Sequence, residues 1–182
     1  MEVWIDPISE EEVGFSFFDK KRFLRNEDIF LGPEVTMKAK LINEVGEKTY
    51  AVIFDRGDEV VEGLLSFARQ KKVQASHFTA IGAFFDVTLG YFNWTKQTYD
   101  KIFIKEQVEV LSLVGNIVFD NGDPKLHAHI VIGKSDGTAH GGHLLEGHVR
   151  PVLEVILVES PSHLHRKMDK ETGIALITFE PD

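Results

Sequence analysis

The chain has 182 residues, a length that suits one domain or one domain with an arm. An apolar content of 43% is enough for a hydrophobic core, and the absence of cysteine excludes disulfides and thiolate metal sites. The formal net charge of −9 argues against binding a polyanion through an overall basic field, so any contact with nucleic acid would need a local patch.

The sequence contains no pattern typical of a membrane span or a signal peptide. No apolar run approaches the ~18–20 residues of a membrane span. The first residues, MEVWIDPISEEE, are acidic and lack the basic-then-apolar pattern of a signal peptide. A chain without cysteine also fits a reducing compartment. We therefore expect a cytoplasmic protein with no membrane partner.

Residues 1–36 differ in composition from the rest of the chain. They hold nine acidic and four basic side chains, which gives them a charge of −5 and leaves −4 for residues 37–182. They show no clean periodicity, yet they contain six aromatic residues: Trp4, Phe15, Phe17, Phe18, Phe23 and Phe30. We expect an acidic, aromatic-containing arm that packs on its own domain or on a neighbouring subunit. The alternative is an unstructured extension.

From residue 37 onward, the pattern predicts two strands and then a helix. Met37–Asn43 and Thr49–Phe54 are rich in strand-forming residues and flank a polar turn. Asp58 is suited to cap a helix from Glu59 to about Lys72, whose apolar residues recur with a 3.6-residue period.

The remainder of the chain is dominated by strand patterns. Further strands are expected at Ser76–Phe85, Asp86–Phe92, Thr98–Ile104, Gln107–Phe119, Val152–Val158 and Ile174–Phe179. A tight junction is expected between the first two of them. One helix among about ten short strands predicts an α+β domain with mostly antiparallel pairing.

Five of the eight histidines lie in the stretch Leu126–His148. Its first half alternates, with His127, His129 and Val131 on one face of a strand. The opposite face of that strand is apolar and consists of Leu126, Ala128, Ile130 and Ile132. Gly133–Gly137 has the composition of a turn, so Thr138–Leu145 should be the returning strand of a hairpin.

The register of this hairpin decides whether the histidines form a site. If Gly133 pairs with Gly137 across a three-residue loop, His127 lies opposite His143 and shares a face with His129. Three imidazoles would then converge as ligands of one divalent ion, with an open position for water or a ligand. Zinc suits such ligands best, although iron or nickel would also fit. A four-residue loop would move His143 to the opposite face, and the alternative is a sheet surface that merely carries histidines.

Other polar residues near the hairpin have less defined roles. His140 falls on the opposite face and is expected to be structural, while the place of His148 stays open. A second pair, His163-Leu164-His165, is expected in an exposed loop with no metal role. Glu146 and Arg150 are candidates for acid–base work, with a solvated charge and an ion-pair partner as the ordinary alternatives. No catalytic residue is predicted.

From Met37 to its end, the chain resembles the PPC (plant and prokaryote conserved) domain family. The segments that carry the resemblance occur in order as KTYAVIFDRGDEVVEGLLSFA, ASHFTAIGAF, GYF, QVEVLSLVGNI, LHAHIVIG, AHGGHLLEGHV and RPVLEVILVE. Residues 1–36 lie outside it. The resemblance implies a bent, mostly antiparallel sheet with one main helix, and a homotrimer. Prokaryotic members are described as predicted DNA-binding proteins, which implies a transcription-associated regulator.

Two departures weigh against direct DNA binding. The chain has no Arg-Gly-Arg-Pro, the AT-hook sequence that accompanies the plant domain, and the arginine of the plant Gly-Arg-Phe-Glu-Ile-Leu-Ser-Leu motif is Gln107. His127, His129 and His143 instead resemble the prokaryotic members. The fold is also similar to that of acetolactate decarboxylase, a zinc enzyme with an HxH pair and a later histidine. The implied function is a metal-binding regulator; the alternative is a small-molecule metalloenzyme or ligand sensor.

Overall fold

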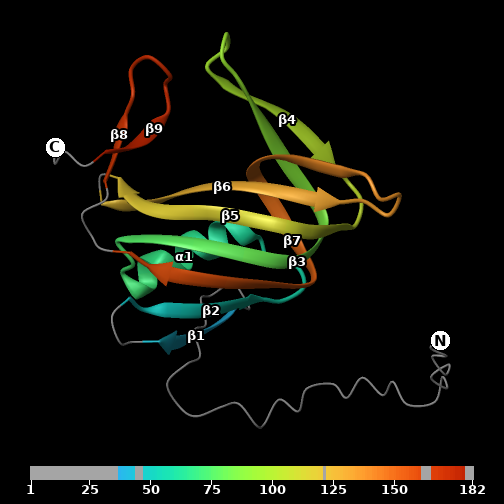
Figure 1. Cartoon of the computed structure of the whole chain (residues 1–182), viewed down its shortest axis with the longest axis horizontal. Coiled ribbons are helices and arrows are strands. Elements are labelled where there is room, and N and C mark those ends of the chain that lie inside the picture. The colour runs from blue at the N-terminus through green and yellow to red at the C-terminus, as the bar shows by residue number, and fades with distance from the viewer. Residues whose placement is uncertain (1–36, 44–46, 121, 161–164, 179–182) are drawn as a thin grey trace, which may run out of the picture.

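The computed structural model describes residues 37–43, 47–120, 122–160 and 165–178 (Figure 1). The predicted arm at residues 1–36 lies outside the described residues. The described part contains one helix, α1 (Val60–Lys71). Its strands are β1 (Lys38–Asn43), β2 (Thr49–Phe54), β3 (Ala75–Asn93), β4 (Thr98–Ile104), β5 (Val108–Asp120), β6 (Asp123–Gly133), β7 (Ala139–Glu159), β8 (His165–Met168) and β9 (Ala175–Thr178). The predicted α+β class is confirmed.

Seven of these strands form one antiparallel sheet in the order β1-β2-β7-β6-β5-β3-β4, and β8 pairs with β9 separately. An additional pairing of β7 with β3 closes a circuit of strands through β5 and β6. Register shifts interrupt the pairing of β3 with both β5 and β7. Such bulges bend and twist a strand, so the sheet curves on itself as the family resemblance implied.

β3 and β7 are longer than the sequence pattern indicated. The junction expected between Phe85 and Asp86 does not exist, because both residues lie inside β3. β7 likewise runs without a break through Gly147, where a side chain would meet the ring of Phe84 at 2.8 Å. The changes of direction are made by bulges within paired strands, and this glycine serves close packing within the strand.

The helix covers one face of the sheet (Figure 1). Its cap is Glu59, whose carboxylate accepts hydrogen bonds from the backbone N–H groups of Val61 at 3.0 Å and Glu62 at 2.7 Å. The prediction that Asp58 caps the helix was wrong, because the Asp58 carboxylate accepts from the backbone N–H of Asp55 in the preceding turn. The buried residues of the helix are Val60, Gly63, Leu64, Phe67 and Ala68. Among the described residues, no helix has the length and apolarity needed to cross a membrane.

Part of the sheet turns an apolar surface outward. Ile81, Leu111, Val114, Val131 and Ile156, from four neighbouring strands, are between 43% and 60% exposed. We call these five residues the apolar outer face. Ile81, Leu111, Val114 and Ile156 line one shallow hollow, and Val131 lies opposite Ser112 of the same hollow. Exposed apolar side chains gathered in this way mark an interaction surface.

Candidate metal centre

β6 and β7 form the predicted hairpin, but with a different register. His129 lies directly opposite His143, whereas the sequence placed His127 there. The pairing is therefore displaced by two residues. Because side chains alternate with a period of two, a displacement of two keeps all three histidines on one face. The predicted face was right and the predicted partner was wrong.

The turn explains the displacement. A hydrogen bond between Lys134 and Thr138 closes a loop of three residues, 135–137. The loop length is as expected, but Gly137 is the last loop residue, and Gly133 pairs with Ala139 instead. Gly137 has a φ of +81°, a conformation that glycine adopts without strain. Its N–H donates to the carbonyl of Lys134 at 2.9 Å, and the N–H of Lys134 donates to the carbonyl of Thr138 at 2.9 Å. Since a three-residue hairpin loop places its left-handed residue last, the loop begins one residue later than predicted.

His127, His129 and His143 form one compact group. One ring nitrogen from each lies within 4.8 Å of the others, and the Nε2 atoms of His127 and His129 are 3.1 Å apart. Two ligand nitrogens of a tetrahedral zinc ion are about 3.3 Å apart, so the spacing of His127 and His129 is close to that of two ligands of one ion. The structure thus brings the three residues together, and their role as ligands remains a prediction.

The surroundings lower the pKa of two of these imidazoles, His127 and His143. Burial lowers the pKa of His143 from its usual 6.5 to about 4, with smaller contributions from the charges of His127, His129 and Arg166. Burial also lowers the pKa of His127, assisted by the charges of Arg166 and His129. A metal ion binds the unprotonated ring, so both residues are in the binding form at neutral pH.

Tyr99 of β4 supports the group from one side. Its ring stacks on His143 with the centroids 4.5 Å apart. Gly90 of β3 lies between β4 and β7, and a side chain at this position would meet the Tyr99 ring at 2.8 Å. The sequence did not indicate Tyr99, because its position depends on pairings of β3 with both β4 and β7.

Arg166 lies near enough to the group for its charge to act on His127 and His143, and the sequence did not indicate it. It is only 6% exposed, and its guanidinium donates to the Ala175 carbonyl at 2.6 Å and to Asn116 Oδ1 at 2.5 Å. Asn116 lies directly opposite His127 in the pairing of β5 with β6. A buried positive charge therefore lies beside the histidines, where it would favour an anionic ligand on a bound metal.

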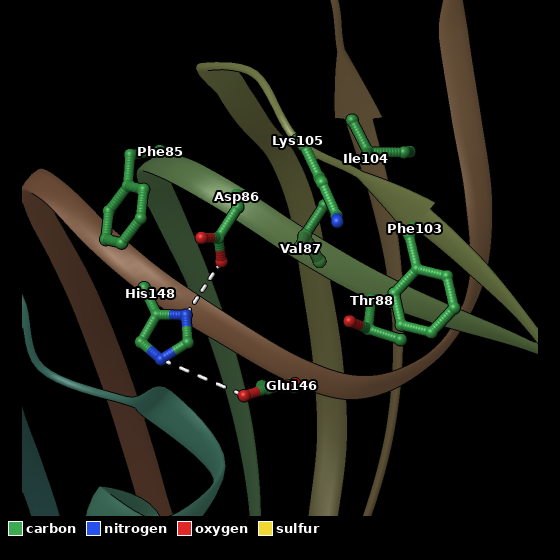
Figure 2. Close-up of a pocket in the computed structure, with 9 residues that line it drawn as sticks. All are labelled: Phe85, Asp86, Val87, Thr88, Phe103, Ile104, Lys105, Glu146 and His148. Carbon is green, nitrogen blue, oxygen red and sulfur yellow. Dashed lines mark hydrogen bonds and ion pairs between the residues drawn. The ribbon is translucent and has the colours of Figure 1, made fainter.

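The remaining candidates lie elsewhere. His140 pairs with Ile132 and is exposed, outside the three-histidine group. His148 contacts Asp86, and Glu146 lies beside His148 (Figure 2). Arg150 is exposed. In the pair His163-Leu164-His165, the first two residues and the side chain of the third lie outside the described part of the chain.

Solved structures with the same architecture extend this comparison. A candidate DNA-binding protein of Bacteroides thetaiotaomicron is 30% identical with a TM-score of 0.72, covering 76% of this chain and 96% of that one. A plant- and prokaryote-conserved protein of Pyrococcus horikoshii is 33% identical with a TM-score of 0.67, covering 70% and 89%. A metal-containing protein of Archaeoglobus fulgidus is 34% identical with a TM-score of 0.67, covering 75% and 96%.

Sequence comparison gives a consistent assignment. The bifunctional protein GlmU of Synechococcus sp. (strain JA-3-3Ab) is 30% identical over 127 residues, which are 68% of this chain and 19% of that protein. The chain thus spans about a fifth of that relative's length. The model of the Plants and Prokaryotes Conserved (PCC) domain matches residues 43–161, well over half of the chain. The family resemblance found in the sequence is confirmed, and the chain belongs to the Plants and Prokaryotes Conserved domain family.

Proposed function

We propose that this protein is a metal-binding regulator in which His127, His129 and His143 hold one divalent ion, zinc before iron or nickel. The observation that carries the proposal is the convergence of three ring nitrogens within 4.8 Å. A related protein of Archaeoglobus fulgidus contains a metal, which supports it. Three neutral imidazoles without thiolates suit zinc, and they leave a fourth position for water or a small ligand.

Metal analysis of the purified full chain tests this proposal. We expect about one zinc per chain after purification in the presence of zinc. Zinc added to the metal-free chain at 100 times its Kd should stabilise the fold by about 2.7 kcal/mol. For a domain of this size, that raises the melting temperature by about 5–11 °C. A metal-free preparation whose melting temperature ignores zinc, iron and nickel contradicts the proposal.

A role in association with DNA is the second part of the proposal. It is supported by relatives described as candidate DNA-binding proteins, among them the one from Bacteroides thetaiotaomicron. With a net charge of −9, binding would have to use a local basic patch. A gel-shift series with genomic fragments at rising salt decides the matter, because phosphate contacts are lost as salt rises. If no DNA fragment shifts at the lowest salt concentration, the proposed role in association with DNA is wrong.

The apolar outer face supports assembly into a homotrimer. Burial of Ile81, Leu111 and Ile156 against further copies would remove a continuous apolar surface from water. This face adjoins the metal centre, because Val114 lies directly opposite His129 in the pairing of β5 with β6. Subunit contact would therefore occur beside the three histidines.

The alternative function is a small-molecule metalloenzyme or ligand sensor. The specific observation in its favour is Arg166, a buried cation beside the metal centre. A metal with an open position polarises a carbonyl or lowers the pKa of bound water, and a nearby guanidinium would hold an anionic ligand. A thermal-shift screen of small carboxylates against the zinc-loaded chain distinguishes this alternative from a purely structural metal. A ligand that raises the melting temperature only when zinc is present favours the alternative.

A further inference from the structure

A second polar site lies away from the three histidines. A cavity of about 420 Å³ opens between β3, β4 and β7, and none of the three histidines lines it (Figure 2). Its walls combine apolar side chains with Asp86, Thr88, Lys105, Glu146 and His148. This volume falls within the range of roughly 300–1,000 Å³ that is usual for small-molecule sites.

One wall of the cavity offers two acceptors that do not bond to each other. His148 Nδ1 lies 2.7 Å from Asp86 Oδ1, and because a carboxylate only accepts, Nδ1 is the donor of this pair. In the neutral tautomer that makes this bond, Nε2 is an acceptor. Nε2 lies 3.9 Å from Glu146 Oε1, which is too long for a direct hydrogen bond (Figure 2). A single ammonium nitrogen about 2.8 Å from both atoms would bridge them at an angle of about 90°.

A zinc ion fits these two atoms less well. At 2.0–2.1 Å from each, it would subtend an angle of about 140°, far from tetrahedral. The wall therefore suits a donor with several N–H groups.

The other polar groups suit a carboxylate. Thr88 is only 7% exposed, its hydroxyl turns into the cavity, and it has no hydrogen-bond partner among the described residues (Figure 2). Lys105 lines the same cavity without an ion-pair partner in the described part of the chain. The Thr88 hydroxyl is therefore available to donate a hydrogen bond to a ligand in the cavity. A hydroxyl and an ammonium together provide the donors that a carboxylate accepts from.

Apolar surface fills the space between these polar groups. Phe103 lies directly opposite Thr88 in the pairing of β3 with β4, and Val87 and Ile104 complete this side. We propose that the cavity binds an α-amino acid with an apolar side chain, its ammonium group on His148 and Glu146 and its carboxylate on Thr88 and Lys105. The protein would then respond to a small zwitterion at a site separate from the metal centre.

Calorimetric titration of the full chain with L-phenylalanine tests this proposal. We expect saturable binding, with N-acetyl-L-phenylalanine and L-phenylalaninamide each at least about tenfold weaker, because each lacks one of the two charged ends. Lys105→Met and Glu146→Gln should weaken binding by a similar factor. Lys101→Met, which removes an exposed lysine of the same strand region outside the cavity, is the matched control and should stay within about twofold.

The isosteric variant Thr88→Val tests whether weaker binding comes from the loss of the hydroxyl or from misfolding. It should weaken binding while its circular dichroism spectrum stays that of the parent chain. The proposal is overturned by the absence of saturable heat up to about 10 mM L-phenylalanine. Equal binding of all three compounds, or an unchanged affinity in Lys105→Met, also overturns it. His143→Ala should bind L-phenylalanine as the parent does, and loss of binding there would place the ligand at the metal centre.

Discussion

Replacement of His143 by alanine is the most direct test of the metal centre. His143 lies opposite His129 and stacks on His127 with the ring centroids 5.1 Å apart. Its removal leaves two imidazoles, which cannot supply the three ligands of the site. We expect the variant to retain its fold and to lose most of its metal.

The size of each effect follows from the contacts that His143 makes. Loss of an outer-shell partner of a metal ligand typically costs 10–100-fold in affinity, so loss of a ligand itself should cost more than about 100-fold. The stacking contacts with Tyr99 and His127 contribute about 0.5–1.5 kcal/mol each, so about 1–3 kcal/mol together. That loss lowers the melting temperature of the metal-free variant by about 2–12 °C.

Competition with a chromophoric zinc chelator measures the affinity, and circular dichroism measures the melting temperature. His140→Ala is the matched control, because His140 lies on the same strand, is exposed and belongs to no group with the other three. His163→Ala should also leave the affinity unchanged. The reasoning fails if His143→Ala keeps zinc within a few-fold of the parent while either of the other two variants loses it.

The structure leads to four further predictions. The metal-free chain should lose stability as the pH falls from 6.5 towards about 4, because the pKa of His143 is lower in the folded chain and the unfolded chain therefore binds more protons in that window. Denaturant titration at several pH values measures this stability, and a stability that does not change with pH contradicts the prediction. Because the pKa values of His127 and His143 are lowered, the chain should lose its metal at a pH below the value of about 6 expected for free imidazoles. Chelator competition at several pH values measures the metal affinity, and an affinity that does not change with pH contradicts this second prediction. Light scattering should give a trimer mass at micromolar concentration, and Leu111→Lys on the apolar outer face should reduce it, whereas a monomeric parent chain would refute assembly. A chain that begins at Met37 should unfold cooperatively and keep its metal, because the described core is built from Met37 onward; an insoluble product would make the arm integral to the fold.

Local pattern determined much of this fold. Alternation placed Ala128, Ile130 and Ile132 on the core side of β6, where each is at most 2% exposed. The same alternation placed the histidines on the opposite face, and that assignment survived an error of two residues in register, because only an odd displacement changes faces. The helix was likewise visible from its apolar period, although its cap was misplaced by one residue.

The surroundings of both sites were decided only by tertiary structure. Asp86 and His148 are 62 residues apart in the chain, and they meet because β3 pairs with β7. Tyr99 of β4 stacks on His143 of β7 because both strands pair with β3. Periodicity reports which face a residue occupies, whereas the choice of a distant partner strand depends on the packing of the whole sheet. For this reason the sequence alone identified the three histidines, while Tyr99, Arg166 and the cavity of His148 required the folded chain.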